Sequence, residues 1–186
     1  MSRQAVLEGR IWVLTDRDGR LIEDIDTDQI FHNAHLHITE MAEMGPYALG
    51  NLEGWKQFAG EAREGDLIFA GRNFGAGSSR QQAVDCFIAL GSRLIAAPSF
   101  GAIYFRNAVN SGLPVLGGLN LAGLVEKGAL QTGDSVCIDL LSGEGHSLTQ
   151  GSDFTLSPMS GVQHDIWLAG GPVSYTHLTL PTTPYV

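Results

Sequence analysis

Short apolar runs alternate with longer amphipathic segments through the middle of the chain. Three of these runs are apolar at nearly every position and lie next to glycine or proline, which is typical of strands buried on both faces. The segments between them place apolar residues at helical spacing, as Ala83, Phe87 and Leu90 do. This order predicts an α/β domain with some parallel strand pairing. The buried strands are expected at residues 66–70, 93–97 and 113–116.

Turn and cap signals predict the remaining elements. A first strand is expected over residues 10–14, before a turn that ends at Gly19, and later strands are expected over 135–141 and 147–156. Residues 23–38 are expected to be irregular, and residues 41–61 to form broken helical stretches. Longer helices are expected over residues 79–90, which Gly91 ends, over 99–110, and over 158–169, which has Pro158 at its start.

Composition and charge limit the classes of function. The chain has 186 residues, of which 44% are hydrophobic, and its net charge is −9 with no cluster of Lys or Arg. These values fit one globular domain and exclude a nucleic-acid surface. No apolar run approaches the length of a membrane span or a signal peptide, so no membrane contact is expected and the cytoplasm is the expected location.

The two cysteines, Cys86 and Cys137, are far apart in sequence and each has apolar neighbours. Their spacing matches neither a metal site nor a CxxC pair, so two reduced thiols are expected and no metal site. Two cysteines are also too few to hold an iron–sulfur cluster by the usual set of thiolates.

The composition changes near the end of the chain. Residues 172–186 contain no Asp, Glu, Lys or Arg and are rich in Thr and Pro. This change predicts one domain over residues 1–171, followed by a disordered or non-native tail over 172–186. An interaction tail is the alternative interpretation.

The glycine-rich stretch over residues 71–82 lies between a predicted strand and a predicted helix. Such a junction directs backbone N–H groups and the positive end of a helix toward one place, where an anion can bind, and Arg80 adds a planar cation suited to a carboxylate. The stretch lacks the Lys of a phosphate-binding P-loop, and Arg80 replaces the last glycine of the dinucleotide motif. Ser78 and Ser79 each precede a glutamine by three residues, so helix capping is an alternative role for both.

Three motifs resemble those of one family, and their order along the chain agrees as well. Gly71–Ala83 (GRNFGAGSSRQQA) resembles NFG-x-GSSR-x-x-A, the segment DIDTDQI at residues 24–30 resembles IDTD-x-I, and residues 99–114 resemble SF-x-x-I-x-x-x-N-x-x-x-x-G-L-P. The family is that of the small subunits of isopropylmalate dehydratase and the matching swivel domain of aconitases. The resemblance runs from about residue 8 to residue 171. Many relatives have Cys in place of Ala76 and Glu-His in place of Gln81-Gln82.

The resemblance implies a layered β/β/α swivelling domain and a hydration–dehydration reaction on a hydroxy di- or tricarboxylate. It implies that this chain binds no cofactor and that a partner large subunit carries a [4Fe–4S] cluster. By the same resemblance Ser78 is the catalytic base, while Ser79 and Arg80 bind a substrate carboxylate. Asp28 matches a family aspartate near the site and is expected to bind substrate, although a turn or cap role is an equal alternative.

In the family, the segment after IDTD-x-I helps to select the substrate, and here it predicts substrate contacts from Leu36 and His37. No Lys or Arg lies between Leu21 and Trp55. This absence favours an alkylmalate, namely 3-isopropylmalate in leucine biosynthesis, with dimethylmalate or homoaconitate as alternatives. His32, His35 and His37 keep the alternatives open, because imidazole can be protonated near neutral pH. A stand-alone anion-binding module is the alternative of another class.

Overall fold

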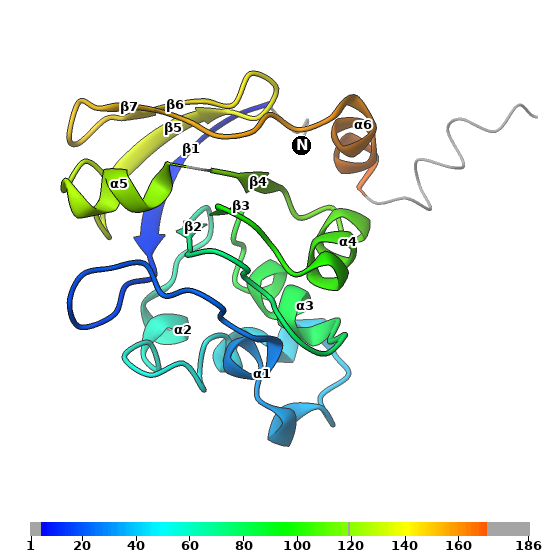
Figure 1. Ribbon diagram of the computed structural model, residues 1–186. Coiled ribbons are helices and arrows are strands. Elements are labelled where there is room, and N and C mark those ends of the chain that lie inside the picture. The colour runs from blue at the N-terminus through cyan, green and yellow to red at the C-terminus, as the bar shows by residue number, and fades with distance from the viewer. Residues whose placement is uncertain (1–4, 119, 171–186) are drawn as a thin grey trace, which may run out of the picture.

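Seven strands form a single curled sheet in the computed structural model, which describes residues 5–118 and 120–170 (Figure 1). The strand order is β4-β3-β2-β1-β5-β6-β7. β1 pairs in parallel with β2 on one side and antiparallel with β5 on the other, so it joins a parallel half to an antiparallel half. The strands are β1 (Val6–Val13), β2 (Leu67–Phe69), β3 (Leu94–Ala97), β4 (Val115–Gly117), β5 (Ser135–Asp139), β6 (Glu144–Ser147) and β7 (Asp153–Thr155).

The helices are short, and α1 to α4 gather against the parallel half of the sheet (Figure 1). The segment between α1 and α2 adds turns of 3₁₀ helix at Asn33–His35, Met41–Glu43 and Gly45–Tyr47. The helices are α1 (Thr27–Ile30), α2 (Phe58–Glu61), α3 (Gln82–Ala89), α4 (Ala102–Asn110), α5 (Leu121–Glu126) and α6 (Gly161–Ala169).

The sheet curls until its antiparallel half covers its parallel half. Phe69 on β2 and Phe154 on β7 belong to strands that are not neighbours in the sheet, yet their ring centroids lie 5.8 Å apart. Both rings belong to one buried core between the two halves. A second core lies between the parallel half and the helices. These two cores separate three layers, which confirms the expected β/β/α arrangement.

β2, β3 and the last three residues of β1 are apolar throughout, because these segments contribute to both cores. On β1, Ile11 and Val13 face the core between the two sheet halves, while Trp12 faces the core beneath the helices. On β2, Leu67 and Phe69 face the core between the sheet halves, and Ile68 faces the core beneath the helices. Strands buried on both faces show continuous rather than alternating hydrophobicity, and for this reason the sequence indicated β2 and β3 correctly. β1 begins at Val6, four residues before the expected start at residue 10.

A buried carboxylate ties β1 to the start of β2. Asp66, whose side chain is 4% exposed, accepts hydrogen bonds from Arg10 at 2.6 and 3.0 Å and from the indole of Trp12 at 2.7 Å. Burial alone would raise the pKa of Asp66, but these bonds and one from the Arg63 N–H outweigh it, so the pKa lies below its usual value. The cluster therefore holds β1 and β2 in register.

Several predicted boundaries are wrong, for local reasons. Residues 147–156 form the end of β6, a turn and β7 rather than one strand, because the chain turns at Gly151 with a positive φ. The last helix begins at Gly161, where Ser160 provides a capping box, and not at Pro158. The sequence did not predict α5, which is too short to show a period. The expected tail, residues 172–186, and the expected boundary at Gly171 lie outside the described residues.

Candidate active site

The three sequence motifs meet at the glycine-rich loop. On one side of the loop, the N–H groups of Gly75 and Ala76 donate to the carbonyl of Ile25 at 2.8 and 3.2 Å. The N–H of Thr27 returns a bond to the carbonyl of Ala76 at 2.9 Å. These bonds form a short parallel bridge between the loop and the segment that enters α1. The first two motifs are therefore joined through their backbones.

The third motif holds the other side of the loop. Phe74 donates from its N–H to the carbonyl of Ser99 at 3.1 Å and accepts from the N–H of Gly101 at 2.9 Å. The hydroxyl of Ser99 also accepts from the N–H of Asn73 at 2.9 Å. The loop is thus fixed between α1 and α4 before it reaches the serines.

Glycine is required at position 75 for two reasons. The residue has a φ of +75°, and an added Cβ would overlap the ring of Tyr104. Tyr104 is buried and donates from its hydroxyl to the carbonyl of Ala83 in α3 at 3.2 Å. Gly77 also has a positive φ, +88°, but the nearest atom to an added Cβ is 3.8 Å away. Gly75 therefore permits close packing, whereas Gly77 only permits the turn.

Neither Ser78 nor Ser79 caps α3, so the alternative capping role is wrong for both. The helix begins later, at Gln82, after Gln81 as its N-cap. The Gln81 side chain does not cap the helix and instead donates to Asp85 and to Ser111, at 2.8 Å each. Both serines are exposed, and among the described residues neither hydroxyl has a hydrogen-bond partner. The backbone N–H groups of residues 78–82 likewise have no acceptor within the described part of the chain. The junction therefore offers free donors and two free hydroxyls, which suits an anion.

Arg80 and Asp28 form an ion pair across the junction. Nη1 of Arg80 lies 2.5 Å from Oδ1 of Asp28 and also donates to the carbonyl of Phe31 at 3.0 Å. The Arg80 side chain is only 15% exposed, so it is held in place rather than extended into solvent. Its Nε and Nη2 atoms have no hydrogen-bond partner within the described residues, which leaves one edge of the guanidinium available for a carboxylate.

Asp28 is itself held by two residues that the sequence did not indicate. Asn51 donates from Nδ2 to the carbonyl and to Oδ2 of Asp28, at 3.2 and 3.3 Å, and the N–H of Asn33 donates to Oδ1 at 3.1 Å. The bond from Arg80 holds the pKa of Asp28 below its usual value. Asp26 rather than Asp28 caps α1, so the alternative capping role of Asp28 is wrong.

The same short helix also fixes the backbone of Ser78. The hydroxyl of Thr27, which is buried, donates to the carbonyl of Ser78 at 3.0 Å. Thr27 and Asp28 are consecutive, so α1 holds Ser78 through the backbone and Arg80 through its side chain. The sequence indicated Asp28 and missed Thr27, although Thr27 belongs to the same motif.

Leu36 and His37 lie apart from this cluster. Leu36 is 39% exposed at the end of a 3₁₀ turn, and the ring of His37 bonds to the carbonyl of Ala34 at 3.0 Å. Among the described residues, neither side chain has a hydrogen bond or ion pair with Arg80. His32 contributes to the lowered pKa of Asp28 and lines a cavity of about 340 Å³ with His35, which packs against the ring of Tyr47 at 4.2 Å. Asn51 lines the same cavity and bonds to Asp28, so this cavity adjoins the candidate site.

The residues of this chain do not fit an iron–sulfur cluster. Cys86 is fully buried in α3, where desolvation raises the pKa of its thiol far above the usual value, and Cys137 lies on β5 in the other half of the sheet. Over residues 5–118 and 120–170, no group of His, Cys, Asp and Glu side chains is arranged to hold a metal ion.

Comparisons with known proteins agree with this arrangement. The family described as "Aconitase C-terminal domain" matches residues 26–117. The methanogen homoaconitase small subunit of Methanothermobacter thermautotrophicus is 36% identical over 180 residues, covering 96% of this chain and 95% of that protein. The 3-isopropylmalate dehydratase small subunit of Caldicellulosiruptor saccharolyticus is 35% identical over 153 residues, covering 82% of this chain and 84% of that protein.

A solved structure shows the same fold. The crystal structure of 3-isopropylmalate dehydratase from Methanocaldococcus jannaschii superposes with a TM-score of 0.79 at 30% sequence identity, covering 93% of this chain and 94% of that chain. The matched family region contains α1, the glycine-rich loop, Arg80 and the third motif. The chain therefore belongs to the aconitase family, among the members in which this domain is a separate small subunit.

Proposed function

We propose that this chain is the small subunit of a heteromeric hydro-lyase, 3-isopropylmalate dehydratase, which isomerises 2- and 3-isopropylmalate in leucine biosynthesis. The observation that carries the proposal is the junction before α3. There an anchored arginine with a free edge lies two residues from an exposed serine hydroxyl and beside unpaired backbone N–H groups. The small-subunit names of the relatives support a two-chain enzyme over a stand-alone anion-binding module.

In this proposal Arg80 binds a substrate carboxylate through Nε and Nη2, because Asp28 and the Phe31 carbonyl already use Nη1. Ser79 lies next to Arg80 and would donate its hydroxyl hydrogen to the same carboxylate. A carboxylate that makes two parallel bonds to a guanidinium is fixed in orientation as well as in position. This binding would place the carbon next to the carboxylate near Ser78.

Ser78 would remove the proton from that carbon. A serine can act as a base only where its alkoxide is stabilised, and the nearby N–H groups, the start of α3 and the Arg80 cation all favour negative charge. The bond from the Thr27 hydroxyl to the Ser78 carbonyl fixes the backbone of Ser78, and this limits the positions that its hydroxyl can take. A [4Fe–4S] cluster on the large subunit would supply the Lewis acid for the leaving hydroxyl.

One observation supports a second candidate for the substrate. The first relative above is a homoaconitase small subunit at 36% identity, and the cavity beside Asp28 is lined by His32 and His35. Imidazole N–H groups at this cavity would suit the third carboxylate of homoaconitate as hydrogen-bond donors. The absence of Lys and Arg between Leu21 and Trp55 supports isopropylmalate, or dimethylmalate, as the first choice.

The test is the activity of the chain co-expressed with its large subunit on 3-isopropylmalate, 2,3-dimethylmalate and homoaconitate. Ultraviolet absorbance follows the unsaturated acid that each reaction forms or consumes. We expect the highest kcat/KM on 3-isopropylmalate and none for the small chain alone, which should also be colourless. Preference for homoaconitate would replace the proposed substrate, and inactivity of the assembled pair on all three would overturn the proposed function.

We also propose a cytoplasmic location. Cys86 and Cys137 are both free thiols, as proteins in a reducing compartment usually have. None of the helices formed by the described residues is long and apolar enough to cross a membrane.

A further inference from the structure

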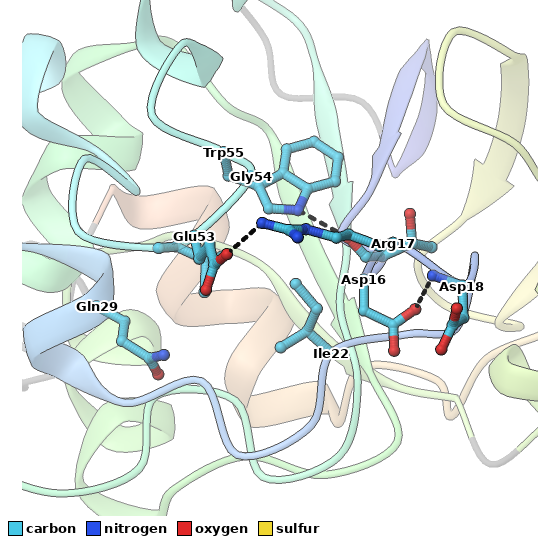
Figure 2. A pocket seen from close by; sticks show the side chains of 10 residues that line it. Asp16, Arg17, Asp18, Ile22, Gln29, Glu53, Gly54 and Trp55 are labelled. Atoms are coloured by element: carbon cyan, nitrogen blue, oxygen red, sulfur yellow. Dashed lines mark hydrogen bonds and ion pairs between the residues drawn. The ribbon is translucent and has the colours of Figure 1, made fainter.

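A cleft of about 600 Å³ opens between the turn that follows β1 and the loop that precedes α2 (Figure 2). A bridge between Thr15 and Leu21 closes the turn. The indole N–H of Trp55, in the loop, donates to the carbonyl of Thr15 at 3.0 Å. This bond joins the two walls, so the cleft is a fixed feature of the fold. It lies outside the cluster formed by Arg80 and Asp28.

The cleft has apolar walls and a charged mouth. Ile22, Leu52 and Trp55 provide the apolar lining, and Trp55 packs edge-on against Trp12 of the core. Such a cavity stabilises an apolar group that leaves water to enter it. The charged lining residues, all exposed, are Asp16, Arg17, Asp18 and Glu53.

Negative charge is in excess at the mouth. Arg17 is already paired with Glu53, with 2.6 Å between Nη2 and Oε1 (Figure 2). The Asp16 carboxylate accepts from the N–H groups of Asp18 and Arg20, both at 2.9 Å. The Asp18 carboxylate has no hydrogen-bond or ion-pair partner among the described residues. An occupant that brings a Lys or Arg to the mouth would therefore find an unpaired carboxylate.

The cleft shares α1 with the candidate active site. Gln29 lines the cleft, and its side-chain oxygen accepts from the N–H of Asp26 at 2.9 Å. Asp26 in turn accepts from the N–H groups of Asp28 and Gln29. The residue next to Gln29 is Asp28, which pairs with Arg80. An occupant of the cleft would thus contact α1, the helix whose Asp28 pairs with Arg80.

We propose that this cleft is a docking site for the large subunit, which would insert an apolar side chain against Ile22 and Trp55 and present a Lys or Arg to Asp18. The inference rests on the proposed function, because it requires a partner that completes the site around the exposed Ser78. Side chains buried in preformed pockets supply most of the binding energy of interfaces, and complementary charge at the rim speeds association. Stable interfaces bury about 1,200 Å² or more, so the cleft would be one anchor within a larger contact surface.

The first test is hydrogen–deuterium exchange of the wild-type chain, free and bound to the large subunit. Docking in the cleft predicts slower exchange of residues 15–22 and 50–57 in the complex. Residues 144–155, in β6 and β7 on the antiparallel half, serve as an internal comparison and should change little. An active complex in which residues 15–22 and 50–57 exchange as in the free chain would overturn the docking proposal and leave the proposed function standing.

The second test reverses the charge at the mouth. Asp18→Lys should weaken the Kd for the large subunit by about tenfold at low salt, and the difference from the wild type should shrink as ionic strength rises. Glu144→Lys makes the same charge change on β6, where Glu144 is exposed, and should leave the Kd within about twofold of the wild type. Equal changes in Kd for the two variants would overturn the proposed contact, because they would depend on the net charge of the chain and not on where the charge lies.

The outcomes separate the docking proposal from the proposed function. Protection of the cleft in a complex that has no hydro-lyase activity would support docking and overturn only the function. Failure to form any complex would overturn both. If residues 15–22 and 50–57 become protected in the isolated chain as its concentration rises, the occupant is a second copy of this chain and the docking proposal is wrong.

Discussion

Asn51 donates from a single side-chain nitrogen to both the backbone carbonyl and the carboxylate of Asp28. The two bonds orient Asp28 so that its other carboxylate oxygen meets Arg80 at 2.5 Å. Among the described residues no hydrogen bond joins Asn51 to Arg80, so Asn51 acts through Asp28. It is therefore a positioning residue for the arginine that we propose binds substrate.

Replacement of Asn51 by alanine should raise KM by roughly three- to tenfold, with little change in kcat, because one hydrogen bond contributes about 0.5–1.5 kcal/mol. Steady-state kinetics of the assembled enzyme measures both constants. Asn51→Asp would place a second carboxylate beside Asp28, so its defect should grow as pH rises and the new carboxyl ionises. An unchanged KM in both variants, or a defect in Asn51→Asp that does not vary with pH, would show that Asn51 does not position Asp28.

Substitution of Arg80 by lysine keeps the charge but removes the planar edge that remains free in the structure. Loss of such a charge-assisted contact costs about 1.5–3 kcal/mol, which corresponds to roughly a ten- to hundredfold fall in kcat/KM. Steady-state kinetics of the assembled enzyme measures this fall in kcat/KM. The matched control is Arg72→Lys, since Arg72 is an exposed residue of the same loop that pairs with Glu23, and its kcat/KM should stay near normal. Equal losses in both variants would contradict the role of Arg80.

The catalytic role of Ser78 came from the family resemblance, while Arg80 was also indicated by its place at a junction between a predicted strand and helix. The positions of β2 and β3 came from the pattern of apolar residues. Phe69 and Ile68 were recognisable because both faces of β2 are buried. Capping by Ser78 was an alternative drawn from local spacing, and it is wrong because α3 begins at Gln82. The Gln81 side chain bonds instead to Asp85 and to Ser111, which is 30 positions away in sequence. Asn51 lies 23 positions from Asp28, and no local pattern connects them. Contacts between distant segments depend on the packing of the whole domain, which hydrophobic periodicity does not specify.

Asp66 should contribute to stability in a pH-dependent way. The pKa of Asp66 is lowered in the folded state, so its contribution is present at neutral pH and is lost as pH falls through the folded pKa. Asp66→Asn should lower the free energy of unfolding at pH 7 by about 3 kcal/mol, the lower end for one partner of a buried pair, because Arg10 is partly exposed. Urea unfolding between pH 7 and pH 2 measures the difference, which should narrow toward the acid end.

The control for Asp66 is the exposed ion pair of Arg17 and Glu53, in which both side chains are more than 80% exposed. Glu53→Gln should change the free energy of unfolding by less than about 1 kcal/mol, because solvent screens such pairs. An Asp66→Asn variant as stable as Glu53→Gln at pH 7 would contradict the structural role of the buried cluster.

Two glycines of the same loop should respond differently to alanine. Gly77→Ala should cost about 1–2 kcal/mol, because only its positive φ opposes a side chain. Gly75→Ala has a similar φ and adds a clash with Tyr104, so its cost should be greater by about 1–3 kcal/mol. Urea unfolding of the three proteins measures both costs. Equal costs would show that the contact between the loop and Tyr104 is not tight.

The measurement that tests the central claim most directly is the kcat of Ser78→Ala in the complex with the large subunit. The Ser78 hydroxyl is exposed and caps no helix, so the substitution should change stability by less than about 0.5 kcal/mol and leave the complex intact. If Ser78 is the base, kcat should fall by at least about a hundredfold while KM stays near its normal value. Ser79→Ala, the adjacent exposed hydroxyl, should instead act mainly on KM. A near-normal kcat for Ser78→Ala in a fully assembled complex would contradict the assignment of the base.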